Sequence, residues 1–134
     1  TAGLDPAERN RFYNLLSEIG ENTIVILSTH IVEDVTNLCS NMAIICLGEV
    51  IAQGNPNTLV DSVQGKIWSK SIEKNDLSAY RNSFQVISTQ LKMGKTQIHV
   101  VCDIQPDESF KAVEAGLEDV YFSRIAEKMD IVTV

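Results

Sequence analysis

A helical repeat of apolar residues is the first pattern along the chain. Asp5 and Pro6 form a typical helix start, because an aspartate side chain can cap a helix and proline fits its first turn. Four apolar residues then share one helical face: Phe12, Leu15, Leu16 and Ile19. With Gly20 as a stop signal, this pattern predicts a helix over residues 6–20.

Two continuous apolar runs follow, at residues 23–27 (TIVIL) and 42–47 (MAIICL). A strand that is apolar on both faces is typical of a parallel sheet covered on both sides. Three residues at helical spacing predict a helix between the runs: Ile31, Val35 and Leu38. The segment is therefore predicted to form a βαβ unit.

A turn at Gly48-Glu49 predicts that the second run continues into an antiparallel hairpin with residues 50–53. A short helix is predicted over residues 58–63. Glu33 and Asp34 fall in the first turn of the helix before the hairpin, where we expect both to be solvated acids.

After Gly65 the pattern changes to alternating polar and apolar residues, which suits a sheet with one wet face. The predicted strands are 66–72, 84–91, 96–103 and a final short strand at 131–134. The predicted helices are 74–81, 106–115 and 117–127. A turn at Met93-Gly94 joins the two middle strands, and the order indicates a small antiparallel α+β lobe.

The predicted fold class is α/β, with a partial parallel sheet (a βαβ unit plus a hairpin) over residues 1–65 and the small α+β lobe over residues 66–134. The net charge is −7, and residues 1–65 hold eight acidic against two basic residues. Neither part has the clustered Lys and Arg that nucleic-acid binding requires. No apolar stretch reaches the roughly 18 residues of a membrane span, so we expect no direct membrane insertion.

Four features of the sequence suggest no site chemistry of their own. The sequence has three widely spaced cysteines, Cys39, Cys46 and Cys102, and no CxxC motif. We therefore expect buried, reduced thiols and no metal site. His99 is expected to be an ordinary sheet residue, and Trp68 part of the second lobe's core. Glu118 and Asp119 are expected to begin a helix, with a docking surface for the other lobe or a partner subunit as the alternative.

Four segments carry a resemblance to a known family, and three of them lie in residues 1–65. TAGLDP, at residues 1–6, resembles the D-loop of ABC-transporter ATPase subunits, and STHIVEDV, at residues 28–35, resembles their H-loop. GEVIAQGNPNTL, at residues 48–59, is similar to the hairpin and exit that follow in this family. LEDVYFSRI, at residues 117–125, more weakly resembles a C-terminal segment of exporter-type subunits. The resemblance adds that the parallel sheet is of the P-loop type and that residues 66–134 are an accessory lobe.

The resemblance implies a role for four residues. His30 corresponds to the switch histidine, which implies a catalytic contact with the γ-phosphate and orientation of the attacking water. Gly3, Leu4 and Asp5 correspond to the D-loop, which implies a place beside the nucleotide and against the partner ATPase of a nucleotide-sandwiched dimer. For Asp5 a simple helix cap can hold together with the D-loop role, and in the isolated chain the cap alone is expected.

The resemblance also has departures. The sequence contains no G-x-x-x-x-G-K-[ST] phosphate loop, no LSGGQ-like signature and no Walker B strand. We therefore expect a fragment of a longer subunit that does not hydrolyse ATP alone. Mg-ATP is implied as the parent's cofactor, and a second ATPase subunit and a transmembrane permease as partners. A cytoplasmic location, peripheral to the membrane through the permease, is the matching expectation.

A different class of function stays open beside this one. Residues from about 66 onward could regulate or dimerise the parent protein, because their predicted order also suits a ligand-sensing or self-associating lobe. A chance resemblance in an unrelated α/β protein is the third possibility.

Overall fold

A computed structural model describes residues 1–133, and the side chains of residues 1–130. The helices are α1 (Pro6–Gly20), α2 (Val32–Leu38), α3 (Pro56–Asp61), the 3-10 turn η1 (Lys74–Asp76), α4 (Leu77–Ser83) and α5 (Leu117–Thr133). The strands are β1 (Met42–Cys46), β2 (Glu49–Gly54), β3 (Ile67–Ile72), β4 (Val86–Lys92), β5 (Lys95–Val101) and β6 (Lys111–Ala112). The protein is therefore mixed α/β, as predicted, and both of its sheets are antiparallel.

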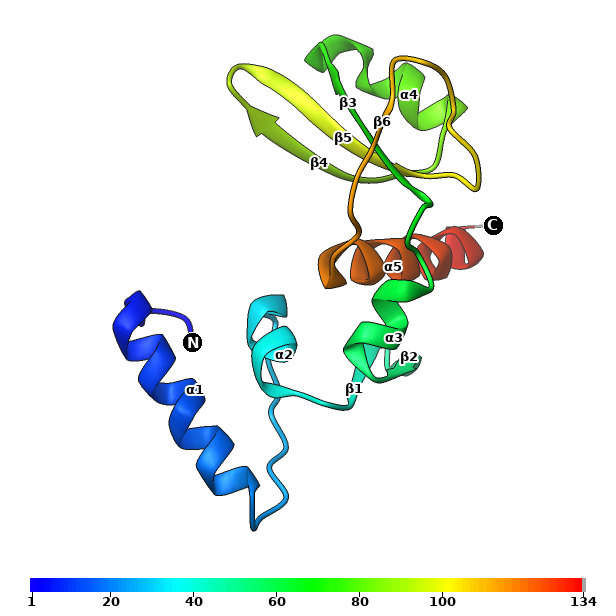
Figure 1. The fold of residues 1–134 in the computed structure, drawn as a ribbon. Coiled ribbons are helices and arrows are strands. Elements are labelled where there is room, and N and C mark those ends of the chain that lie inside the picture. Colours follow the sequence, from blue (N-terminus) through cyan, green and yellow to red (C-terminus); the bar gives the residue numbers. More distant parts are fainter. Residues whose placement is uncertain (134) are drawn as a thin grey trace.

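Helix α1 begins where its sequence signal lies. The Asp5 carboxylate accepts a hydrogen bond from the Glu8 backbone N–H at 2.8 Å, and Pro6 occupies the first turn. This satisfies one of the amide groups that a helix start leaves without a partner. The helix predicted over residues 6–20 and its cap at Asp5 are both confirmed. Figure 1 shows α1 standing apart from both sheets, with only α2 beside it.

The predicted hairpin is also confirmed, but its turn lies at Leu47 and Gly48, one residue earlier than the predicted turn at Gly48-Glu49. Strands β1 and β2 pair antiparallel from Met42–Gly54 to Cys46–Glu49. Asn55 then caps α3, since its side-chain oxygen accepts from the Asn57 backbone N–H at 2.8 Å. The short helix predicted over residues 58–63 is present, and it begins two residues earlier, at Pro56.

The C-terminal sheet has the strand order β4-β5-β3-β6. Its central hairpin turns at Met93 and Gly94, as predicted, and both residues have positive φ angles of 53° and 80°. Two consecutive residues of this kind match the twist of a two-residue hairpin, and glycine takes up the second position without strain.

Helix α5 connects the two sheets. It packs against α2, α3 and the β1–β2 hairpin on one side and against β4 on the other (Figure 1). One apolar core runs through these contacts, and its fully or nearly buried members include Ile44, Ile67 and Val120. This core joins residues on both sides of Gly65.

A second core lies on the other face of the C-terminal sheet. Ile98, Val100 and Phe110 are at most 1% exposed, and α4 covers them. Phe110 packs edge-on against Phe84, with ring centroids 5.2 Å apart. Trp68 lies at the border of this core and donates its indole N–H to the Cys102 carbonyl at 2.9 Å, so its predicted core position is confirmed.

The strand predicted at residues 23–27 is not formed. The segment is extended but pairs with no other strand among residues 1–133, and Ile24 and Ile26 are 90% and 91% exposed. The parallel pairing with residues 42–47 is accordingly absent here. The apolar run predicts burial, but a strand also needs neighbouring strands whose backbone groups form hydrogen bonds with its own.

Two predictions in the last third of the chain are wrong. Residues 106–115 form a loop and the short strand β6 instead of a helix, because Phe110 inserts into the sheet's core and Ala112 pairs with Trp68. The final strand is replaced by the last turn of α5, which runs on through Thr133. Residue 134 lies outside the described residues. The helix predicted at residues 117–127 is confirmed.

Among the helices of residues 1–133, none combines the length and apolarity that crossing a bilayer demands.

Candidate functional site

Asp34 is the centre of a polar network that joins two segments far apart in the sequence. It is only 1% exposed. One carboxylate oxygen accepts from the Thr1 hydroxyl at 2.6 Å and from the Tyr13 hydroxyl at 2.7 Å. The other accepts from the Thr1 α-amino group at 3.1 Å and from the Thr29 hydroxyl at 3.3 Å. The network therefore holds the start of the chain, α1 and the segment before α2 together.

The electrostatics of this network favour a charged carboxylate. Burial alone would raise the pKa of Asp34, but the hydrogen bonds from Thr1 and Tyr13, with the nearby α-amino group, lower it to about 2. Burial raises the pKa of the Tyr13 hydroxyl, and its hydrogen bond to the Asp34 carboxylate raises it further. The site is thus built around one buried negative charge that is saturated with donors.

Asp34 corrects the expectation that both acids in the first turn of α2 are solvated. Its neighbour Glu33 is solvated, with a side chain 62% exposed and 3.5 Å from Arg9. A sequence signal for the difference exists. Asp34 lies three residues after Ile31 and four before Leu38, on the helix face that carries the apolar residues.

His30 lies next to this network and is exposed. The Thr29 hydroxyl accepts from the Ile31 backbone N–H at 3.0 Å, which closes a small turn around His30. Because the same hydroxyl donates to Asp34, the backbone on both sides of His30 is held in place. The imidazole therefore stands on a fixed turn at the surface, where a ligand can reach it.

The residues expected in the D-loop form a tight turn at the other end of the network. The Leu4 backbone N–H donates to the Thr1 carbonyl at 3.2 Å, and Gly3 has a φ angle of 82°, which suits glycine. Gly3 and Asp5 are exposed, and Leu4 is partly buried. In this chain Asp5 acts as the cap of α1.

A second group of polar side chains lies at the start of α5. Asp119 accepts from the Gly116 backbone N–H at 2.9 Å with one oxygen, and its other oxygen lies 2.9 Å from His99 Nδ1. Burial opposes ionisation of Asp119, but the His99 contact and the Gly116 hydrogen bond hold its pKa below the usual range. His99 thus ties the sheet to α5, beyond the ordinary sheet role expected of it.

The other potential metal ligands and the cysteines form no further candidate site among residues 1–130. Within residues 1–130, no three His, Cys, Asp or Glu side chains are grouped as ligands of a metal ion. The three cysteines are free and partly buried, where full burial was expected. Burial raises the pKa of the Cys39 thiol, and the charge of Asp34 raises it further, which disfavours the reactive thiolate.

No family model matches the chain. About half of it is nevertheless similar to ATP-binding proteins of ABC transporters. The Nod factor export ATP-binding protein I of Cupriavidus metallidurans is 36% identical over 66 residues, which is 48% of this chain and 22% of that protein. The protein of the same name from Rhizobium meliloti is 35% identical over 66 residues, 48% of this chain and 20% of that protein.

A third similar protein comes from a plant. ABC transporter A family member 7 of Arabidopsis thaliana is 36% identical over 59 residues, which is 44% of this chain and 6% of that protein. The match thus spans about a fifth of the length of the export proteins and less of the plant protein. The chain is ABC ATPase-like over about half of its length.

Proposed function

We propose that residues 1–65 are the distal part of the nucleotide-binding domain of a longer subunit that hydrolyses ATP to power membrane transport. Residues 66–134 are then its accessory C-terminal lobe. His30 contacts the γ-phosphate in the longer protein, and Gly3, Leu4 and Asp5 contribute to the nucleotide-dependent contact with a second ATPase subunit. A transmembrane permease holds the protein at the cytoplasmic face of the membrane.

One observation carries this proposal: the Asp34 network ties the two motif segments together. Thr1 begins the TAGLDP turn and Thr29 precedes His30, and both donate to the same carboxylate. Two segments that are separated by a 15-residue helix are thereby held at one end of α2. A site that senses a phosphate and transmits its presence to a partner surface needs such a fixed connection between the two.

The chain's own residues do not fit a complete Mg-ATP site. They offer one exposed imidazole and the backbone of one turn, and the sequence has no glycine-rich phosphate loop with its lysine. Mg-ATP therefore belongs to the longer protein in this proposal, and the 134-residue chain alone is expected to be inactive. When bound there, the nucleotide would supply the phosphoryl group, and His30 would contribute a hydrogen bond to it.

The exposed apolar segment supports the same proposal. Residues 23–27 are extended, apolar and unpaired in this chain, although their composition suits a covered parallel sheet. In the longer protein they would pair with strands from outside this chain. The predicted parallel sheet would then be completed by those strands.

The test is a histidine substitution in the full-length protein that carries this sequence. His30→Ala is expected to lower the ATPase rate about 10²-fold, as is typical when one positioned transition-state donor is removed. Nucleotide affinity is measured in parallel with a fluorescent ATP analogue and is expected to change little. Asn41→Ala, at an exposed position outside the network, is the control and leaves the rate unchanged.

An unchanged ATPase rate in the His30→Ala protein would contradict the proposal. So would ATP hydrolysis by the unmodified 134-residue chain at a rate comparable to that of the full-length protein.

A further inference from the structure

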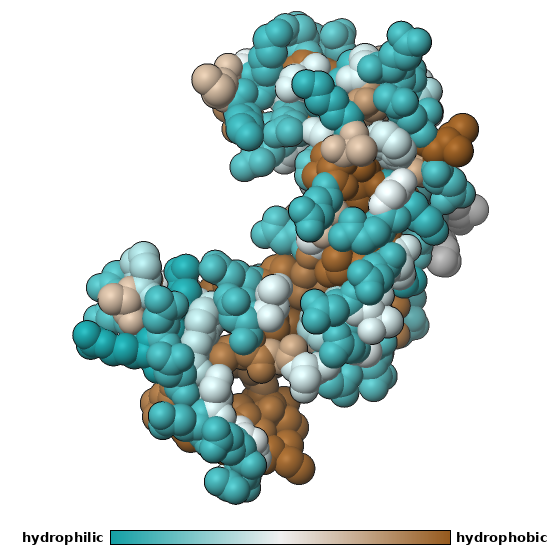
Figure 2. Space-filling view, in the orientation of Figure 1, coloured by the Kyte–Doolittle hydropathy of each residue, from teal (hydrophilic) through white to brown (hydrophobic). Residues whose placement is uncertain are grey.

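An open cleft of about 770 Å³ separates α2 from the C-terminal sheet. Its walls come from α2, from strands β4 and β5, and from the loop before α5 and the first turns of that helix. Figure 2 shows the molecule hollowed between the part that holds α1 and α2 and the C-terminal sheet. The volume falls within the roughly 300–1,000 Å³ of small-molecule sites.

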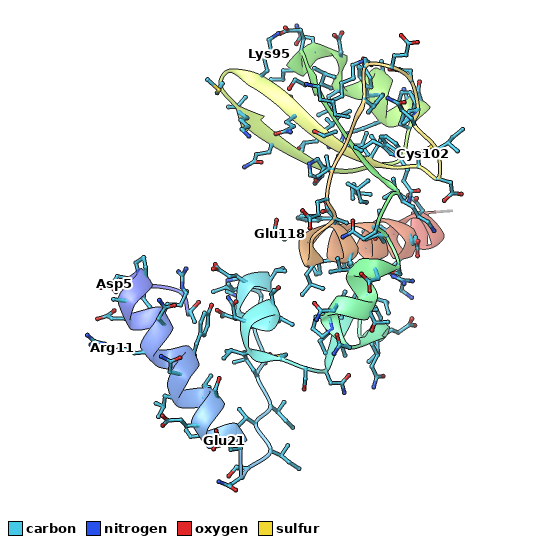
Figure 3. The ribbon with its side chains drawn as sticks, in the orientation of Figure 1. Asp5, Arg11, Glu21, Lys95, Cys102 and Glu118 are labelled. Atoms are coloured by element: carbon cyan, nitrogen blue, oxygen red, sulfur yellow. The ribbon has the colours of Figure 1, made fainter. Side chains whose placement is uncertain are left out.

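The charged side chains of this cleft have one sign. Four acids line it: Glu33, Glu114, Glu118 and Asp119. No Lys or Arg lines it. Glu33 is offset by Arg9 and Asp119 by its contact with His99, whereas Glu114 and Glu118 have no ion-pair partner among residues 1–130. Figure 3 shows Glu118 at the first turn of α5, directed toward the hollow.

The cleft also offers an apolar surface and fixed polar groups. Phe122 lines it and is 38% exposed, next to the partly buried Val32 and Val113. An aromatic ring beside carboxylates can hold a cation by its face as well as by charge. The His99–Asp119 contact fixes the imidazole within the lining, where it presents polar atoms in a defined position.

We propose that this cleft binds a small organic cation, an amine or guanidinium with an aliphatic or aromatic body. The charged end lies between Glu114 and Glu118, and the apolar body lies against Phe122 and Val32. A ligand seated there contacts both α2 and the C-terminal sheet. Its binding therefore fixes the position of α2 relative to that sheet, and this holds whether or not the chain belongs to an ATPase.

The experiment is a titration of the ¹⁵N-labelled 134-residue chain, followed by amide chemical shifts. The probe is 2-phenylethylamine, with the neutral 2-phenylethanol and the anionic 3-phenylpropanoate as matched compounds of similar shape. The amine is expected to produce saturable shifts at Thr36, His99 and Glu118, which lie on three different walls. The alcohol and the anion are expected to produce none.

A pair of double variants tests the assignment to this cleft. Glu114→Gln combined with Glu118→Gln removes the two unpaired charges and is expected to raise the Kd for the amine about fivefold or more, as the loss of close ion pairing predicts. The control combines Glu108→Gln with Glu127→Gln. These two glutamates are also exposed and lie outside the cleft. The control changes the net charge by the same amount, and because it leaves the cleft intact the Kd for the amine is expected to stay the same.

Three results would overturn the proposal. The first is equal binding of the alcohol, which would make the site merely apolar. The second is an equal loss of affinity in the control variant, which would indicate general charge attraction. The third is the absence of saturable shifts at millimolar amine.

Discussion

The first 40 residues and the remaining described residues are stabilised in opposite ways. In α1, the extended segment and α2, the only buried residue is the charged Asp34, and four hydrogen bonds converge on it. From β1 onward the structure has two apolar cores, with Ile98, Val100 and Val120 entirely buried. Apart from Val32 and Val35 of α2, which pack at the edge of the first core, the first region is held by this polar network, whereas the second is held by burial.

The difference shows what each kind of contact contributes. Burial of apolar area is the dominant favourable term in folding, whereas hydrogen bonds mainly replace those made to water. A polar network fixes geometry at a site but does not supply a core. The N-terminal region therefore has a defined site and little stability of its own, which agrees with the proposal that it completes its core with other residues.

The largest effect is expected from a cavity in the second region. Phe110→Ala removes a ring that is 1% exposed and is expected to lower the free energy of unfolding by about 3–5 kcal/mol. The measurement is urea unfolding followed by Trp68 fluorescence. Leu91→Ala, at a side chain that is 74% exposed, is the control and should change little. Equal losses in the two variants would contradict the core assignment.

The next effect is local to the first region. Asp34→Ala leaves the hydroxyls of Thr1 and Tyr13 without their acceptor and is expected to lower the opening free energy of α2 by about 1.5–3 kcal/mol. Hydrogen exchange of the α2 amides measures this change, while the amides of β5 stay unchanged. Glu33→Ala, in the same helical turn but exposed, is the matched control. Loss of protection in β5 would show that the two regions are not separate in stability.

Acid is expected to weaken the same network. The pKa of Asp34 is lowered from 3.8 to about 2 in the folded chain, so its stabilising effect is fully present above about pH 4 and is lost as the pH falls through about 2. The amide shifts of α2 followed between pH 5 and pH 1.5 should report this transition, and Asp34→Asn should abolish it. A transition centred near pH 4 would contradict the donor-saturated network.

The smallest effect is expected on the exposed segment. Ile26→Ala should change the stability of this chain by less than about 0.5 kcal/mol, because the side chain is 91% exposed. In the proposed longer protein the same substitution should cost about 2–5 kcal/mol, as for a buried isoleucine. Thermal unfolding of both proteins compares the two values. Equal small effects would count against a parallel sheet completed by other strands.

Local signals allowed much of the fold to be predicted from the sequence. The Asp5 cap, the β1–β2 hairpin and the Met93-Gly94 turn depend on residues close together in the chain, and all three are present. The failures depend on distant partners. Residues 106–115 show apolar residues at a spacing that a helix also allows, and only the aromatic pocket formed by Tyr80 and Phe84 draws Phe110 into the sheet.

The Asp34 network shows the same division between local signals and distant partners. TAGLDP and STH identify two segments, and their positions at the start of α1 and just before α2 follow from local patterns. The carboxylate that connects them was missed, because an acid in the first turn of a helix is ordinarily solvated. Its buried state depends on Tyr13 and Thr1, which are 21 and 33 residues away.

Hydrogen exchange of the unmodified 134-residue chain tests the contrast between the two regions most directly. The amides of residues 24–27 are compared with those of residues 98–100 in one sample at neutral pH. The structure predicts exchange near the rate of an unfolded chain for the first set, because it pairs with no strand, and strong protection for the second, which lies in the centre of a sheet. Comparable protection of the two sets would contradict the account.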